Sequence, residues 1–202
     1  GAIPRAFFLT IGLPVRDDAW LAGFTKGMTE LSRQAGCPLL GGDTTRTAKV
    51  GDIHAPVTIS ITAMGELPQS MGLTRAGARP GDDIWVSGCV GGAWAALMHR
   101  WGKLTLDARV FPSAALAMDR PNPRNALGTA LLSSATSCAD ISDGLAQDLG
   151  HILERSGVDA DVLWDAVPKH PALAALSQEQ QVEAAMSGGD DYELVFTAIS
   201  AV

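Results

Sequence analysis

The segment from Cys138 to His151 constrains the fold of this chain more than any other, because its periodicity changes from that of a strand to that of a helix. Its first residues alternate between apolar and polar. From Leu145 on, the apolar residues Leu145, Leu149, Ile152 and Leu153, the last two just past the segment, follow the i, i+4, i+7, i+8 spacing of a packed helix. Three polar residues, Asp140, Ser142 and Asp143, fall at the junction. The segment therefore predicts a mixed fold with acidic residues between a strand end and a helix start.

Two roles are open to this junction. Carboxylates are ionised near neutral pH, so two of them around a hydroxyl form a hard, oxygen-rich site suited to Mg²⁺. Asp and Ser are also preferred at a helix N-cap, so capping of the following helix is the structural alternative. His151, three residues after Asp148, is expected to pair with it on the helix face rather than to act as a base.

Composition excludes several classes of protein. With 47% hydrophobic and 18% charged residues, the 202-residue chain is typical of a globular protein with a sizeable core. Its net charge of -7 argues against a non-specific nucleic-acid binder, which needs a basic surface. The three cysteines are far apart and lack CxxC spacing, so neither a disulfide framework nor a zinc site is indicated. No apolar run approaches the ~20 residues of a membrane span, and we expect a soluble, cytoplasmic protein without membrane or nucleic-acid partners.

Periodicity divides the chain into two mixed units. Apolar runs predict strands at residues 7–11, 57–64, 83–87, 160–163 and 193–197. Stripes of helical spacing predict helices at residues 17–35, 93–99, 125–135, 145–155 and 179–186. A stretch rich in Gly, Pro, Arg and Ser around residues 65–81 marks the boundary, so we expect domains at 1–68 and 69–202. The five tryptophans are expected to pack the cores.

Three acidic turns that contain glycine stand out: Gly41–Thr44, Asp140–Gly144 and Ser187–Glu193. Glycine lets backbone N–H groups approach an anion closely, and the following acid can coordinate a cation that bridges to it. Because basic residues are hardly clustered, a phosphate ligand would need Mg²⁺ to balance its charge. Arg75 is a well-placed cation whose guanidinium can hold phosphate oxygens bidentately. A fourth glycine turn, at residues 88–92, matches GxGxxG poorly and does not indicate dinucleotide binding.

Five motifs occur in the order and spacing of a known family. They are Gly-Gly-Asp-Thr-Thr-Arg at 41–46, Leu-Thr-Arg-Ala-Gly-Ala-Arg-Pro-Gly-Asp at 73–82, Arg-Pro-Asn-Pro-Arg at 120–124, Asp-Ile-Ser-Asp-Gly-Leu-Ala-Gln-Asp-Leu-Gly-His at 140–151 and Ser-Gly-Gly-Asp-Asp-Tyr-Glu-Leu at 187–194. In these motifs the chain resembles the thiamine-monophosphate kinase family. The resemblance implies transfer of the ATP γ-phosphate to thiamine phosphate, giving thiamine diphosphate. It also implies two α/β domains of the aminoimidazole ribonucleotide synthetase-like fold, and a homodimer.

The resemblance assigns roles to individual residues. It places ATP on Gly42, Asp43, Arg75 and Ser142, Mg²⁺ on Asp43, Asp140 and Asp143, and the thiamine end of the substrate on Asp190, where the family usually has Glu. ATP is then a substrate and Mg²⁺ the cofactor, both lying between the domains. The attacking phosphate oxygen is already ionised at neutral pH, so no side chain is needed as a catalytic base.

The same resemblance implies that the chain is truncated at both ends, with the first domain incomplete and the end of the second absent. Two alternatives stay open. One is another ATP-dependent enzyme of the superfamily, such as aminoimidazole ribonucleotide synthetase or selenophosphate synthetase. The other is a non-catalytic dimerising remnant. From these residues alone we do not expect full activity.

Overall fold

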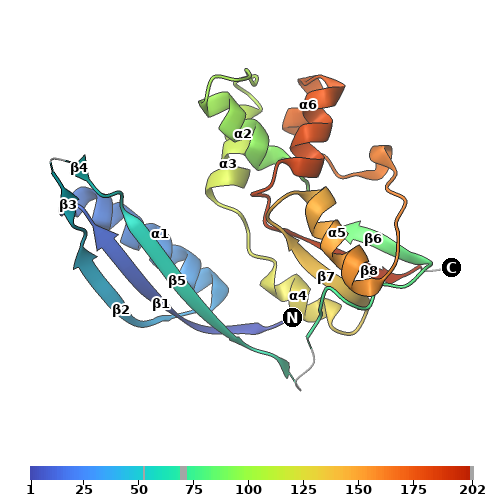
Figure 1. The fold of residues 1–202 in the computed structure, drawn as a ribbon, viewed down its shortest axis with the longest axis horizontal. Coiled ribbons are helices and arrows are strands. Elements are labelled where there is room, and N and C mark those ends of the chain that lie inside the picture. Colours follow the sequence, from blue (N-terminus) through green and yellow to red (C-terminus); the bar gives the residue numbers. More distant parts are fainter. Residues whose placement is uncertain (52, 69–71, 201–202) are drawn as a thin grey trace. The chain divides into compact units, whose positions relative to one another are not determined.

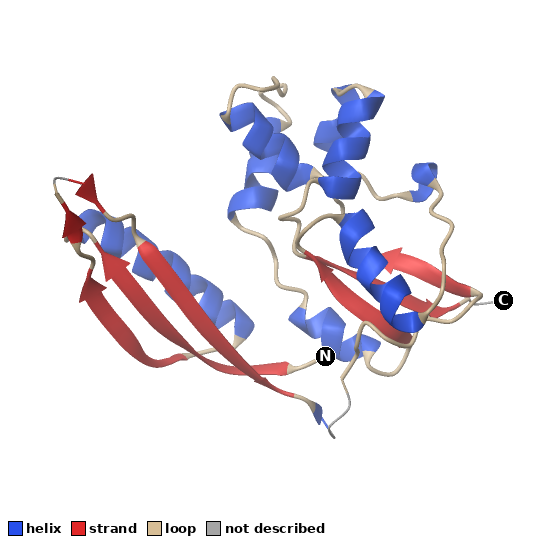
Figure 2. Cartoon of the chain, in the orientation of Figure 1, coloured by secondary structure: helices blue, strands red, loops and turns tan. Residues whose placement is uncertain are grey.

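The computed structural model describes residues 1–51, 53–68 and 72–200. The chain divides into two compact units, Ala2–Ser70 and a second unit of Met71–Val202 that also includes Gly1. Each unit has its own three-stranded sheet and its own helices (Figures 1 and 2).

The first unit is a three-stranded sheet with one long helix. Its elements are β1 (Ile3–Leu13), α1 (Asp18–Ala35), β2 (Leu39–Arg46), β3 (Lys49–Val50), β4 (Ile53–His54) and β5 (Thr58–Glu66). The sheet order is β2-β1-β5, with β1 parallel to β2 and antiparallel to β5. The buried apolar residues of this unit lie on β1, the central strand: Ala6, Phe7, Ile11 and Leu13.

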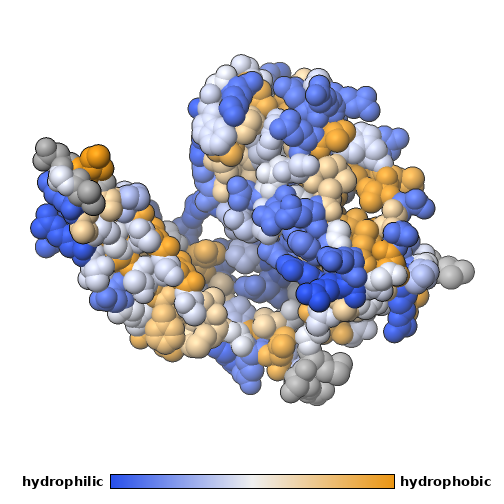
Figure 3. All heavy atoms as spheres, in the orientation of Figure 1, coloured by the Kyte–Doolittle hydropathy of each residue, from blue (hydrophilic) through white to orange (hydrophobic). Residues whose placement is uncertain are grey.

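Helix α1 confirms the helix predicted at residues 17–35. The Asp17 side chain accepts a hydrogen bond from the Trp20 amide at 3.0 Å, and Gly36 ends the helix in the left-handed conformation. Along α1, which the structure describes throughout, no residue is fully buried. Strand β5 likewise leaves Ile59, Ile61 and Met64 exposed, and Figure 3 shows apolar surface along the strands of this unit.

The second unit packs helices around an antiparallel sheet of order β6-β8-β7. Its strands are β6 (Asp82–Val86), β7 (Ala135–Ile141) and β8 (Glu193–Ile199), and its helices are α2 (Gly92–Arg100), α3 (Phe111–Asp119), α4 (Asn125–Leu131), α5 (Leu145–Ser156) and α6 (Gln178–Val182). Short 3₁₀ turns η2 (Trp164–Ala166) and η3 (Pro171–Ala175) and the π-helical η4 (Glu183–Ser187) complete it. Helix α5 packs against β7, and its Ile152 is fully buried together with Ile141 and Val195.

The fold class is confirmed, since both units mix helices and strands, but several local predictions are wrong. Residues 160–163 form a loop that leads into η2 rather than a strand. The predicted helix at 125–135 stops at Leu131 because β7 begins at Ala135. Helix α3 was not predicted, and within the described chain no side chain caps its start.

Two further predictions are corrected. The segment Gly41–Thr44 lies inside strand β2 and not in a turn. Three tryptophans are exposed rather than in a core: Trp20 by 39%, Trp85 by 53% and Trp101 by 59%. Among the described residues, no helix has the length and apolar character that a membrane span requires.

Candidate active site

The loop between β7 and α5 is held by the buried carboxylate of Asp148, which we expected from the sequence to pair with His151. Asp148, on the inner face of α5, is only 2% exposed. Its Oδ2 accepts hydrogen bonds from the amides of Ser142 at 2.9 Å and Asp143 at 3.0 Å. The Asp148 carboxylate therefore binds the backbone of the loop, instead of pairing with His151 as expected. Folding the loop back in this way leaves the side chains of Asp140 and Asp143 exposed.

The capping alternative for these acids is not supported. The N-cap of α5 is Gly144, and within the described chain no side chain caps this helix. Asp143 Oδ2 instead accepts a hydrogen bond from the side-chain nitrogen Nε2 of Gln147 at 3.3 Å. Gly144 has a φ of 111°, and a Cβ there would lie 2.7 Å from the Cα of Ser187. Glycine is required because the neighbouring turn packs directly against this position.

That neighbouring turn is the acidic segment Ser187–Glu193, so the structure brings two of the predicted motifs together. The Asp190 amide donates to the Ser142 carbonyl at 2.9 Å, and the Tyr192 amide donates to the Ile141 carbonyl at 2.8 Å. Asp190 and Tyr192 have φ values of 58° and 50°. Such left-handed conformations are uncommon for residues other than glycine, and strained backbone of this kind is enriched at functional sites.

Electrostatics link the carboxylates of both motifs to one phenol. The Tyr192 hydroxyl donates to Asp190 Oδ1 at 3.0 Å. The pKa of Tyr192 is raised above its ordinary value, first by this hydrogen bond, then by desolvation, and then by the charges of Asp190, Asp140 and Asp143. Three exposed carboxylates therefore surround one exposed aromatic ring at this end of the sheet.

The residue between Asp190 and Tyr192 points the opposite way. Asp191 is 8% exposed, and its two carboxylate oxygens lie 3.0 and 2.9 Å from the Gly91 amide. Burial raises the pKa of Asp191 to about 6, against the lowering effect of hydrogen bonds from the amides of Gly91 and Ala93, while the charges of Glu193 and Asp190 raise it further.

A second buried carboxylate holds the same turn to the rest of the unit. Glu193 accepts from the Arg124 guanidinium, with 2.6 Å between Arg124 Nε and Glu193 Oε2, and also from the Ser87 hydroxyl. A Cβ on Gly88 would lie 2.3 Å from Glu193 Oε1. The glycines of the turn at 88–92 are thus explained by protein contacts, since a Cβ would meet Glu193 at Gly88, Leu173 at Gly91 and His170 at Gly92.

The remaining predicted site residues are Arg75 in the second unit and Gly42 and Asp43 in the first. Arg75 lies in the segment beside β7, where its carbonyl accepts from the Ser156 hydroxyl at 3.2 Å. Its guanidinium pairs with none of the three carboxylates among the residues that the structure describes. Gly42 and Asp43 belong to the first unit, on β2. A Cβ on Gly42 would lie 1.8 Å from the Leu9 carbonyl oxygen of β1, so the close approach of two strands requires this glycine.

The donor set has the chemistry that Mg²⁺ prefers, although it is not a complete cage. Asp140 and Asp143 offer hard carboxylate oxygens, and the Ser142 hydroxyl lies between them in the chain. Within the described ranges, no group of three or more His, Cys, Asp or Glu side chains is arranged to hold a metal. Mg²⁺ commonly binds through one or two carboxylates together with substrate phosphates and water. The junction fits that mode of binding.

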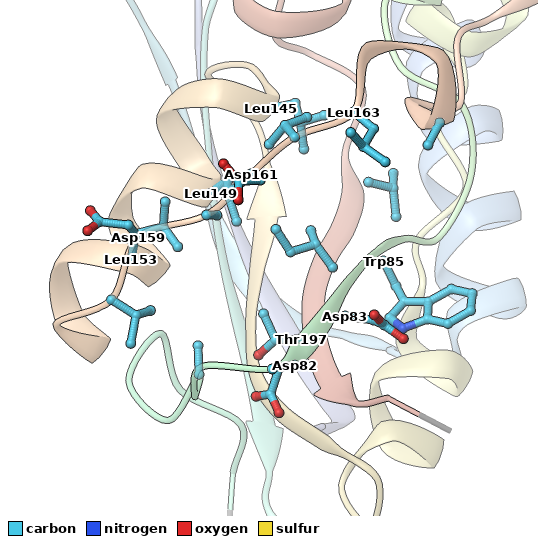
Figure 4. Close-up of a pocket in the computed structure, with 18 of the residues that line it drawn as sticks. Asp82, Asp83, Trp85, Leu145, Leu149, Leu153, Asp159, Asp161, Leu163 and Thr197 are labelled. Atoms are coloured by element: carbon cyan, nitrogen blue, oxygen red, sulfur yellow. The ribbon is translucent and has the colours of Figure 1, made fainter. Parts of the chain in front are cut away.

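A large cavity lies apart from these residues. It has a volume of about 880 Å³ and is bounded by β6, by the leucines of α5 and by the segment 158–168 (Figure 4). Acidic side chains at Asp82, Asp83, Asp159 and Asp161 line it among apolar ones. The acids of the β7–α5 junction do not line it. We therefore place the candidate site at the junction and not in this cavity.

Comparison with known proteins gives this site a family context. Residues 1–67 match the family described as AIR synthase related protein, N-terminal domain. The chain is 38% identical over 199 residues to the thiamine-monophosphate kinase of Escherichia coli K12, covering 98% of this chain and 59% of that relative. It thus spans somewhat more than half the length of the curated relatives it matches.

Solved structures agree with the sequence match. The crystal structure of thiamine-monophosphate kinase from Stenotrophomonas maltophilia K279a superimposes with a TM-score of 0.90 at 39% identity, over 98% of this chain and 62% of that one. A structure described as AaThiL complexed with AMPPCP and TMP superimposes with a TM-score of 0.84 at 27% identity, again over 98% of this chain and 62% of the other.

Proposed function

We propose that this chain, which is similar to the thiamine-monophosphate kinases, carries part of the site that transfers the ATP γ-phosphate to thiamine phosphate. The observation that carries the proposal is the junction of two acidic motifs. Asp140 lies at the end of β7 and Asp143 in the loop that follows, and Asp190 is hydrogen-bonded through its backbone to the same loop. A relative of the same fold is described in complex with AMPPCP and TMP, which supports a nucleotide and a phosphorylated co-substrate as ligands.

In the proposed reaction the protein positions two anions and needs no base. The acceptor is a phosphate oxygen that is ionised at neutral pH, so in-line placement and charge neutralisation suffice. Asp140, Asp143 and Asp43 would hold Mg²⁺, which supplies positive charge between the two phosphate groups when bound. Asp148 keeps the loop of Ser142 and Asp143 in one conformation through two amide hydrogen bonds.

Other residues bind the two substrates. Ser142, Gly42, Asp43 and Arg75 would contact ATP, and Asp190 the thiamine end of the acceptor. The shorter Asp190 reaches one methylene less far than the Glu usual in the family. Its hydrogen bond from Tyr192 fixes where the carboxylate lies.

The proposal extends to the setting of the enzyme. We place it in the cytoplasm as a homodimer, with the first unit in the contact between copies. The exposed apolar residues of β5, including Ile59 and Ile61, are suited to burial against a second copy.

Turnover tests the proposal directly. Mg-ATP and thiamine phosphate should give ADP and thiamine diphosphate, detected by chromatography, with no product when Mg²⁺ is chelated. Turnover of an aminoimidazole or selenide substrate in place of thiamine phosphate would assign the chain to a sister enzyme. A dimerising remnant would show neither turnover nor Mg²⁺-dependent nucleotide binding; the match to 59% of the curated relative's length keeps this second candidate in view.

A further inference from the structure

The turn that carries Asp190 is anchored from beneath by the residue next to it. Both carboxylate oxygens of Asp191 lie within hydrogen-bonding distance of the Gly91 amide, and the Ala93 amide also donates to this side chain. Gly91 is the N-cap of α2, and within the described chain no side chain forms a cap hydrogen bond there in the usual local way. Asp191, 100 residues further along the chain, therefore accepts the hydrogen bond that a local N-cap side chain would accept at the start of α2.

This anchor sets the conformation of the two residues on either side. Asp191 is buried at the start of α2, whereas Asp190 and Tyr192 on either side of it are exposed. Both of these residues are in the left-handed region, which a free turn would leave. Tight packing restricts the turn further, since a Cβ on Gly188 would lie 2.3 Å from the Ala184 carbonyl oxygen and 2.8 Å from the Trp94 Cβ.

The outward pair acts as one unit at the site. The Tyr192 hydroxyl donates to the Asp190 carboxylate at 3.0 Å, and Tyr192 is 46% exposed. Loss of the anchor would let both residues relax out of the left-handed region and separate the two groups. A shift of about 1 Å in a positioned group is enough to weaken substrate binding or catalysis substantially.

We propose that Asp191 is a positioning residue: by binding the first amides of α2 it holds the Asp190 carboxylate and the Tyr192 hydroxyl together where the acceptor substrate binds. The part that concerns the acceptor rests on the proposed function. The part that concerns the geometry of Asp190 and Tyr192 does not.

The chain offers a direct reporter of this geometry, because Tyr192 is its single tyrosine. Tyrosine labelled with ¹³C at Cζ gives one resonance whose shift against pH yields the phenol pKa, in metal-free buffer. Asp191→Asn replaces one of the two accepting oxygens by an NH₂ group, which donates and cannot accept. We expect the Tyr192 pKa to fall toward the ordinary value of about 10. Asp191→Ser is the second variant, since a hydroxyl is a natural N-cap acceptor and buries no charge, and it should give an intermediate shift.

Kinetics supply the second readout. In both variants the KM for thiamine phosphate should rise, by about tenfold in Asp191→Asn, while the KM for ATP stays within about twofold. Thr197→Val is the matched control. Thr197 lies on β8, as Glu193 does, and the variant removes its buried hydroxyl, which is hydrogen-bonded to Ser137, without changing the turn. It should lower stability and leave both the Tyr192 pKa and the two KM values unchanged.

A double-mutant cycle with Asp190→Asn separates positioning from general stability. If Asp191 acts through Asp190, the effect of Asp191→Asn on the Tyr192 pKa should largely vanish once Asp190 is already replaced. The proposal is overturned if Asp191→Asn folds with an unchanged Tyr192 pKa, or if Thr197→Val moves that pKa equally. If the pKa shifts but no turnover of thiamine phosphate exists in any variant, the positioning role stands and the proposed function fails.

Discussion

The buried carboxylate of Asp191 makes a quantitative prediction about stability and pH. Its pKa is raised from 3.8 to about 6 by burial in the folded protein. The folded state therefore binds a proton more tightly than the unfolded chain does between these two values. The sign follows directly: this group stabilises the fold most at pH values below 3.8, and that contribution is lost as the pH rises through about 6.

The magnitude follows from the size of the pKa difference. A shift of one pKa unit corresponds to about 1.4 kcal/mol, so the change from 3.8 to about 6 amounts to roughly 3 kcal/mol over the whole range. Roughly half of that loss falls above pH 5. Because other acids titrate as well, the quantity to compare is the difference in unfolding free energy between the natural chain and Asp191→Asn at each pH.

Urea unfolding followed by tryptophan fluorescence measures this difference, since Trp85, Trp94, Trp101 and Trp164 all belong to the second unit. Between pH 5 and pH 7.5 the natural chain should lose more than 1 kcal/mol relative to Asp191→Asn. Asp107→Asn is the control, for which the stability difference should change with pH in the opposite direction. Hydrogen bonds from Arg109 lower the pKa of Asp107, so the natural chain should gain stability relative to that variant as the pH rises through the acidic range. A flat or rising difference for Asp191→Asn would refute the reasoning.

Three further variants test other parts of the account. Arg124→Ala leaves the Glu193 carboxylate buried without its guanidinium, and we expect a loss of about 3 kcal/mol in unfolding free energy, measured in urea, with Arg109→Ala on the surface as the near-neutral comparison. Gly42→Ala places a Cβ against the Leu9 carbonyl and should cost about 2 kcal/mol or more in the first unit, reported by Trp20 fluorescence; an unchanged midpoint would show that the strands can separate. Asp148→Ala leaves the Ser142 and Asp143 amides without their acceptor, so Mg²⁺-dependent nucleotide binding should weaken about tenfold or more by calorimetry, and unaltered affinity would remove Asp148 from the site.

How much could be predicted from the sequence depended on whether the signal was local. The strand-to-helix change at the acidic junction and the helix predicted at 17–35 are local, and both are confirmed. Residues 160–163 were predicted as a strand from their apolar side chains, but they form a loop in which Val162 and Leu163 are exposed. Nothing in a local pattern distinguishes these two outcomes.

The supports of the candidate site depend on contacts between distant segments. Asp191 meets Gly91, and Glu193 meets Arg124, across 100 and 69 residues. One acid of the same motif points to solvent and the next is buried, a difference that residue type does not reveal. Asp190 and Tyr192, on either side of the buried Asp191, both have positive φ values.

The most direct test of the site is calorimetric titration of the protein with a non-hydrolysable ATP analogue, with and without Mg²⁺. The account predicts binding that requires Mg²⁺ and is lost in Asp140→Asn/Asp143→Asn, with Asp82→Asn/Asp83→Asn at the separate cavity as the matched control that retains it. Equal binding with Mg²⁺ absent, or full Mg²⁺-dependent binding in the Asp140→Asn/Asp143→Asn variant, would contradict the assignment of this junction as the metal-nucleotide site.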